Sequence, residues 1–134
     1  MASIACASGM AAIMNAILNI VRSGDEIVSS ASLYGGSIDL FRDIEEFGIK
    51  TRYVKNNDWE AIEGAINEHT RLLFAETIGN PCLDVTDVER LAEIAHAHKI
   101  PLILDNTTAT AYLFQGLKPV SYTHLRAHET VLDL

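Results

Sequence analysis

The chain has 134 residues, the size of one domain, and its 49% hydrophobic and 21% charged residues are typical of a globular protein rather than a disordered one. Acidic residues outnumber basic ones by 18 to 10, for a formal net charge of −8, which argues against nucleic acid and anionic membrane surfaces as partners. The two cysteines are too few for a disulfide framework or a four-thiolate metal site, which favours a reducing, cytoplasmic setting.

The first helix is predicted to open at residues 8–10, with Ser8 as its N-cap, because apolar residues recur at nearly helical spacing from there to Val21. Residues 23–25, Ser-Gly-Asp, are expected to end it. The apolar stretch is too short for a bilayer span, which takes about 20 apolar residues, and it lacks the basic start of a signal peptide. We therefore expect a soluble protein.

The rest of the chain alternates between extended and helical patterns. Strands are predicted at residues 26–30, 50–55, 71–76 and 101–105, and helices at residues 37–47, at 57–67 and from 86 onward. The last two helices open on sequences with the spacing of capping boxes, Asn57 with Glu60 and Thr86 with Glu89. Residues 71–76 are a continuous apolar run with polar ends, as expected for a strand buried on both faces.

Strands that alternate with helices are typical of right-handed βαβ units and a parallel sheet. We therefore expect an α/β fold, with three layers α/β/α around a mostly parallel sheet. Residues 120–134 have no clear period and are not expected to continue this pattern.

Polar and aromatic residues follow the predicted strands, at the edge where parallel α/β sheets bind ligands. They form three groups: Tyr34; Glu76, Thr77 and Asn80; and Asp105, Asn106 and Thr107. The helix that opens at Ser8 and Gly9 offers backbone N–H groups and a positive dipole end, which suit a phosphate. Taken singly, each feature has a simpler interpretation, such as a plain cap at Ser8 or a turn at Asn80 before Pro81. Their convergence on one edge favours a ligand site.

Several other kinds of site are not indicated. The sequence has no GxGxxG dinucleotide fingerprint, no GxxxxGK[ST] phosphate loop and no GxSxG hydrolase motif. His96 and His98 lie two residues apart on a predicted helix and so point to different faces, which argues against a metal site. We expect no metal.

The candidate residues stand in motifs that resemble the large domain of the pyridoxal-phosphate (PLP) enzymes of cysteine and methionine metabolism. The matching segments, in family order, are ASGMAAI (7–13), SGDEIV (23–28), LYGGS (33–37), ETIGNP (76–81), AHKIPLILDNT (97–107) and ATAYL (109–113). The resemblance implies that residues 1–119 are a partial PLP-binding large domain of the type I transferase fold. Within the family, ETIGNP is most similar to the wording in O-acetylhomoserine sulfhydrylases.

The resemblance also implies roles for single residues in binding the cofactor. The backbone N–H groups of Gly9 and Met10 would bind its phosphate. Tyr34 would stack on the pyridine ring and act near the leaving group of the substrate, as a catalytic residue. Asp105 would pair with the ring nitrogen and keep it protonated.

Three further residues complete the implied site. Asn80 would donate a hydrogen bond to the ring hydroxyl of the cofactor, and Thr107 would help to fix the ring or its partners. Glu76 belongs to the same motif and is assigned only a supporting role.

The implied reaction is a γ-replacement in which acetate leaves O-acetylhomoserine and sulfide or a thiol adds, giving homocysteine or methionine. Methionine γ-lyase and cystathionine γ-synthase are the alternatives within the family. The parent protein is expected to be a homotetramer that acts on a small amino-acid substrate. A non-catalytic doubly wound domain that binds a ligand or a partner is the alternative of another class.

The family holds its cofactor on a lysine, and the motif of that lysine is absent from this sequence. Lys118 stands in Gly-Leu-Lys-Pro, which differs from the family motif. We therefore expect the chain alone to be an inactive fragment. Residues 120–134 do not match the family and are interpreted as an artefactual tail.

Overall fold

The computed structural model describes residues 4–114 and 123–125, which form five helices and five strands within those ranges. In chain order they are α1 (Gly9–Ile20), β1 (Glu26–Ser30), α2 (Gly35–Glu45), β2 (Lys50–Val54), α3 (Trp59–Ala65), β3 (Thr70–Glu76), α4 (Val88–His98), β4 (Leu102–Asp105), α5 (Thr110–Leu113) and β5 (Thr123–Leu125). The four strands expected from the sequence are therefore confirmed to within a residue at each end.

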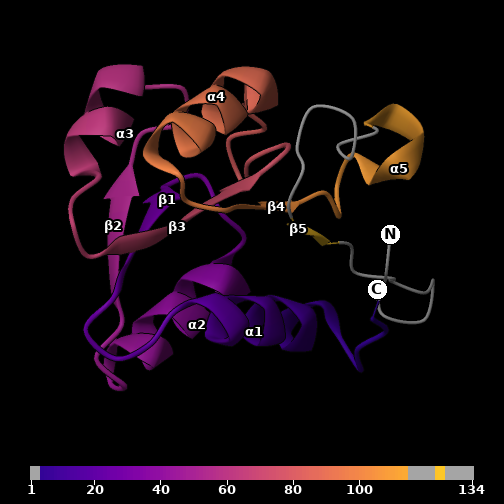
Figure 1. Cartoon of the computed structure of the whole chain (residues 1–134). Helices are drawn as coiled ribbons and strands as arrows, with labels where there is room; N and C mark the ends of the chain where they lie inside the picture. The colour runs from indigo at the N-terminus through magenta and orange to yellow at the C-terminus, as the bar shows by residue number, and fades with distance from the viewer. Residues whose placement is uncertain (1–3, 115–122, 126–134) are drawn as a thin grey trace.

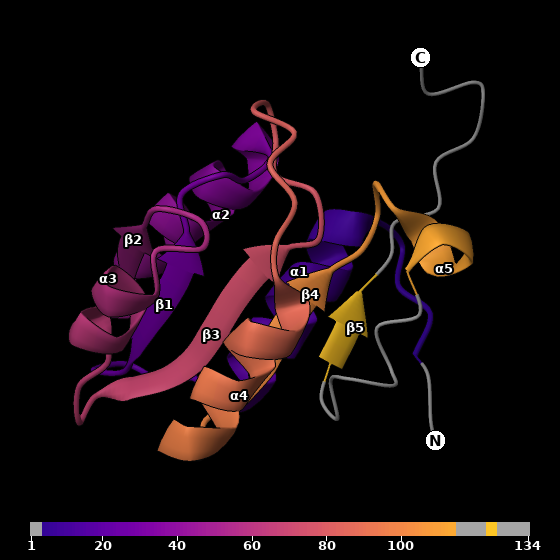
Figure 2. The ribbon, with the colours of Figure 1, turned by 90° about the horizontal axis from the view of Figure 1, so that it is seen from above.

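The strands form one parallel sheet in the order β2-β1-β3-β4-β5 (Figure 2). After β2 the chain crosses to the other side of β1 and then adds β3, β4 and β5 in sequence. The direction of winding thus reverses between β1 and β3, and ligands of such sheets bind at the carboxyl ends of the strands at this reversal.

Helices cover both faces of the sheet, so the predicted three-layer α/β/α fold is confirmed (Figure 1). Helices α1 and α2 lie on one face and pack on alternate strand residues such as Phe74 and Ile103. Helices α3 and α4 lie on the other face, against Leu73 and Leu104. Strand β3 is buried on both faces except at Arg71, as its apolar run predicts.

Both predicted capping boxes are displaced by one residue. The N-caps of α3 and α4 are Asp58 and Asp87, and each carboxylate accepts a hydrogen bond from the amide three residues on, at 3.1 Å. The Asn57 side chain instead bridges to the second helix: it donates to the Val85 carbonyl and accepts from the Asp87 amide. The Thr86 hydroxyl donates to the Glu76 carbonyl at 2.6 Å, so it is already engaged.

The sheet extends further than the sequence pattern predicts. Thr123–Leu125 pairs with β4 as the parallel strand β5, although residues 120–134 were not expected to continue the alternation. A free strand edge offers a row of backbone donors and acceptors, so a short segment can pair there without any hydrophobic period. Lys118, which precedes the interpreted tail, and the tail residues other than 123–125 lie outside the described residues, and the boundary at residue 119 stays a prediction.

A buried carboxylate ties together the strands at the amino edge of the sheet. Glu26 is 6% exposed; it accepts from Arg52 Nε at 2.6 Å and from Asn67 Nδ2 at 2.7 Å. Hydrogen bonds from Arg52, and then from Asn67, hold the pKa of Glu26 at about 2. This network links β1 to β2 and to the turn before β3. None of the helices in residues 4–114 is long and apolar enough to span a membrane.

Candidate functional site

Helix α1 precedes β1 and runs antiparallel to the strands (Figure 1). Its N-terminus therefore lies at the carboxyl edge of the sheet. Ser8 caps the helix: its side chain accepts from the Ala11 amide at 3.1 Å, and its carbonyl accepts from the Ala12 amide. The amides of Gly9 and Met10 belong to the first turn, which has no acceptor within the helix. Two N–H groups at the positive end of the dipole can therefore bind an anion.

The Tyr34 backbone is tied to the end of the central strand. Tyr34 is the N-cap of α2, and its amide donates to Oε1 of Glu76 at 2.7 Å, across 42 residues of sequence. Tyr34 as a whole is 56% exposed, and its ring lies against Gly36. A Cβ added to Gly36 would stand 2.6 Å from Tyr34 Cε1 and 3.4 Å from Met10 Sδ. The Tyr34 ring and the Met10 side chain, which comes from the first turn of α1, thus both lie close to Gly36.

Asp105 and Glu76 are register partners at the ends of β4 and β3. Each lies two residues beyond a residue packed under α1 and α2, so both side chains are on that face of the sheet. The Asp105 carboxylate is fixed by Thr107, whose amide and hydroxyl donate to Oδ1 at 2.9 and 2.6 Å. A ligand that meets Asp105 therefore meets an oriented carboxylate.

Glu76 is a carboxyl group with a strongly shifted pKa at this edge, and it is 6% exposed. Burial raises the pKa of Glu76 to about 7, and the charge of Asp105 adds to that rise, whereas the hydrogen bond from the Tyr34 amide opposes it. Glu76 therefore exchanges its proton near neutral pH. Sequence reasoning assigned it only support; the one sequence signal for more was its place at a strand end, and its register with Asp105 is known only from the structure.

Two other candidates at strand ends, Thr77 and Asn106, use their polar groups in hydrogen bonds that stabilise the fold. Thr77 and Asn106 lie on the opposite face of the sheet from Glu76 and Asp105, and both are buried. The Thr77 hydroxyl donates to Asn106 Oδ1 at 2.9 Å, and Asn106 Nδ2 donates to the Phe114 carbonyl. Their polar groups are used in joining β3 to β4 and to the segment after it.

Asn80 lies at the tip of a hairpin that follows β3. Antiparallel bridging of Ile78 with Val85 builds the hairpin, and the peptide bond between Asn80 and Pro81 is cis. Asn80 is exposed, and no hydrogen bond joins it to Tyr34 or Asp105 in the described part of the chain. No contact within the described residues joins Asn80 to another predicted site residue, whereas Thr107 contacts Asp105 directly.

The hairpin is packed closely against the turn that carries Tyr34. Gly79 is the point of contact. A Cβ added there would lie 2.6 Å from the Ser32 Cβ and 3.0 Å from the Ser32 carbonyl oxygen, and it would overlap Asp84 Oδ1. Burial acts to raise the pKa of Asp84, but the polar side chains of Ser32 and Asn56 beside it outweigh that effect and lower the pKa. The carboxylate thus joins the hairpin to the ends of β1 and β2.

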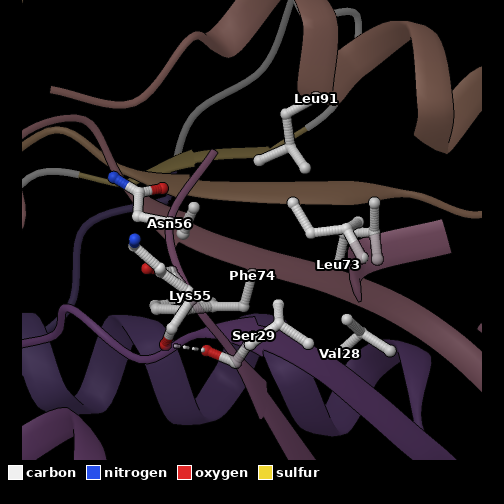
Figure 3. Close-up of a pocket in the computed structure, with 11 residues that line it drawn as sticks. Val28, Ser29, Lys55, Asn56, Leu73, Phe74 and Leu91 are labelled. Atoms are coloured by element: carbon white, nitrogen blue, oxygen red, sulfur yellow. Dashed lines mark hydrogen bonds between the residues drawn. The ribbon is translucent and has the colours of Figure 1, made fainter. Parts of the chain in front are cut away.

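A small cavity lies on the other face of the sheet (Figure 3). It holds about 10 Å³, the space for about one water molecule. Val28, Leu73 and Leu91 give it apolar walls, and Asn56 stands at its end. It is too small for a cofactor and lies away from Tyr34.

The described residues bring neither a metal-binding cluster nor a lysine next to Asp105. Among residues 4–114 and 123–125, no group of three or more His, Cys, Asp or Glu could hold a metal ion. Lys50 begins β2 at the amino edge, and Lys99 ends α4 at the same edge. Lys55 follows β2, which β1 and β3 separate from β4.

Replacing Gly36 with alanine is expected to displace the Tyr34 ring while leaving the fold intact. Gly36 has no unusual backbone angle and lies in the first turn of α2, where alanine is the better helix former by about 1 kcal/mol. The new Cβ would overlap the ring, which can swing away into solvent. Ring-proton chemical shifts of Tyr34 would report the displacement, with Gly35→Ala, which meets nothing within 4 Å, as the control. Unchanged Tyr34 shifts in Gly36→Ala would contradict the packing described.

The fold and this edge define an α/β protein with a doubly wound parallel sheet and a polar site at the reversal of strand order. The sequence identifies it further: residues 1–120 match the family described as Cys/Met metabolism PLP-dependent enzyme. The chain belongs to that family, as the resemblance of its motifs predicts.

Individual relatives agree with the family match. The chain is 44% identical to O-acetyl-L-homoserine sulfhydrylase of Leptospira meyeri over 118 residues, covering 87% of this chain and 27% of that protein. It is 35% identical to L-methionine gamma-lyase of Fusobacterium nucleatum, over 87% of this chain and 30% of that protein. A solved structure of O-acetylhomoserine sulfhydrylase from Wolinella succinogenes superposes with a TM-score of 0.80 and 44% identity, over 84% of this chain and 32% of the other. The chain thus spans about 30% of the length of these relatives.

Proposed function

We propose that this chain is the cofactor-binding part of a PLP-dependent sulfhydrylase that makes homocysteine or methionine from O-acetylhomoserine and sulfide or a thiol. The observation that carries the proposal is that the first turn of α1, Tyr34 and Asp105 all stand at the carboxyl edge of one sheet, with Glu76 bonded to the Tyr34 amide and paired with Asp105. The match to sulfhydrylases at 44% identity supports this reaction.

The residues present fit PLP by their chemistry. The free amides of Gly9 and Met10 suit the doubly charged phosphate. Asp105 suits a protonated ring nitrogen, since a charge-assisted hydrogen bond between the two is stronger than a neutral one. The exposed Tyr34 side chain, which lies against Gly36 at the start of α2, suits stacking on the pyridine face.

Each residue then has a definite task. When bound, PLP supplies an electron-accepting ring that stabilises negative charge beside the substrate amino group. Asp105 holds the proton on the ring nitrogen, and Thr107 orients the Asp105 carboxylate through its two hydrogen bonds. Tyr34 covers the ring and stands near the leaving group, as the catalytic residue of this chain. Asn80 donates to the ring hydroxyl from the tip of its hairpin.

The finer parts of the proposal concern the whole protein. It is a homotetramer of the cytoplasm in this proposal, and this chain alone is inactive because its sequence lacks the family's lysine motif. The 35% identity to a methionine γ-lyase makes that activity the second candidate. Assays of the full-length protein with O-acetylhomoserine plus sulfide, and with methionine alone, would separate the two.

Changing Asp105 to asparagine is expected to weaken PLP binding to this chain by about tenfold or more, because the ring nitrogen loses its ionic partner. Equilibrium dialysis of the 134-residue chain against PLP gives the dissociation constant. Asp39→Asn is the matched control, since Asp39 is an exposed carboxylate on α2, paired with Arg42. Equal affinity of wild type and Asp105→Asn, or affinity lost equally in both variants, would contradict the proposed role of Asp105.

A further inference from the structure

We propose that Glu76 is a positioning residue for Tyr34: its carboxyl oxygen holds the Tyr34 amide and thereby fixes the ring against Gly36. The inference rests on the proposed function for its meaning, because Tyr34 is the residue proposed to cover the cofactor ring. It rests on contacts of this chain alone for its geometry.

The anchor itself is rigid. Glu76 ends the central strand β3, and its backbone is held by pairing with Asp105 on one side. On the other side the Thr86 hydroxyl donates to the Glu76 carbonyl. The side chain is buried, so few alternative orientations are open to it. A side chain held in this way fixes the position of its hydrogen-bond partner relative to the sheet.

The Tyr34 turn needs such an anchor. Tyr34 joins a strand to a helix, and as the N-cap it has an amide outside the helical hydrogen-bond pattern. The bond to Glu76 Oε1, at 2.7 Å, satisfies that amide. The carbonyl of Tyr34 accepts from the Ser37 and Ile38 amides, so the bond also fixes the start of α2. Losing the acceptor frees the amide and releases the turn from β3.

The bond also lies at the reversal of strand order. Tyr34 follows β1 and Glu76 ends β3, which are the two strands between which the winding changes direction. The chain leaves β1 toward β2 on one side of the sheet and leaves β3 toward β4 on the other side. A contact between the two loops therefore fixes their relative position. Glu76 is the described residue that makes this contact with the Tyr34 amide.

The test compares two variants of similar size. Glu76→Gln keeps an oxygen acceptor, whereas Glu76→Met fills the same space without one. Hydrogen exchange of the Tyr34 amide, taken relative to the Phe74 amide in the same strand as Glu76, separates a local release from a general loss of stability. We expect exchange at Tyr34 to accelerate about tenfold or more in Glu76→Met and to stay within about threefold of wild type in Glu76→Gln. Contacts in NMR spectra between the Gly36 α-protons and the Tyr34 ring should weaken in Glu76→Met alone.

A matched control comes from the opposite edge of the sheet. Glu26 is as buried as Glu76, at 6% exposure, but it has no contact with Tyr34. Glu26→Met should therefore leave the ratio of Tyr34 to Phe74 exchange unchanged. An unchanged ratio in Glu76→Met, or equal acceleration in Glu76→Gln and Glu76→Met, would overturn the inference. Because no cofactor is added, either result is separate from a failure of the chain to bind PLP.

Discussion

Replacing Phe74 with alanine is expected to lower the free energy of unfolding by about 4 kcal/mol, the largest effect we foresee for one substitution. Phe74 is 1% exposed, at the centre of the central strand. Its ring meets Phe41 of α2 edge-to-face, with 5.0 Å between ring centroids. Truncation removes the apolar surface and the aromatic pair, and leaves a cavity between the sheet and α2.

Urea denaturation followed by circular dichroism measures this loss. Phe47→Ala is the matched control, because Phe47 is 65% exposed and its truncation should change stability by less than about 0.5 kcal/mol. Phe74→Leu gives a milder test, at about 1 kcal/mol, should the alanine variant be too unstable to purify. Equal stabilities of the Phe74 and Phe47 variants would show that the core described between the sheet and α2 is not the one that holds the protein together.

The second large effect is the pH dependence removed by Glu76→Gln. The pKa of Glu76 is raised from 4.5 to about 7 in the folded chain, so the folded state holds this proton more tightly than the unfolded state does. Its contribution to stability is fully present below pH 4.5 and is lost as pH rises through about 7. The loss amounts to about 3 kcal/mol by pH 8, at about 1.4 kcal/mol for each unit of pKa. Glutamine does not titrate, so the variant lacks this loss.

The measurement is the difference in unfolding free energy between Glu76→Gln and wild type, followed from pH 4 to pH 8. We expect the difference to rise in favour of the variant by about 3 kcal/mol over that range. Glu26→Gln should behave in the opposite sense. The pKa of Glu26 is lowered to about 2, so its contribution is present above pH 4.5 and disappears as pH falls toward 2. A flat difference curve for Glu76→Gln would mean that Glu76 titrates normally in the folded chain.

Much of the fold follows from hydrophobic patterns that admit few alternatives. The apolar run of β3 is too short and too continuous for an amphipathic helix, so it predicts a strand buried on both faces, and the structure agrees. The parallel arrangement follows in turn from the helices between strands. The sequence predicts the position of a helix cap less exactly, because two adjacent residues can each act as the cap in Asn57-Asp58 and in Thr86-Asp87. The tertiary contacts of Asn57 and Thr86 decide in favour of the aspartates.

The site is less accessible to sequence reasoning than the sheet. Strand ends predict which residues reach the carboxyl edge, and Tyr34 and Asp105 do lie there. They do not predict on which face each residue falls, so Thr77 and Asn106 look like Glu76 and Asp105 until the register is known. The raised pKa of Glu76 depends on burial and on a neighbour from another strand, which no local pattern encodes. Strand β5 is missed because three residues carry no period.

The contact at Gly79 has a mechanical meaning for this end of the molecule. The turn carrying Tyr34 and the hairpin carrying Asn80 touch so closely there that not even a methyl group fits between them. A shift of either loop toward the other must therefore displace both, so the packing at Gly79 couples the position of the Asn80 hairpin to that of the Tyr34 turn.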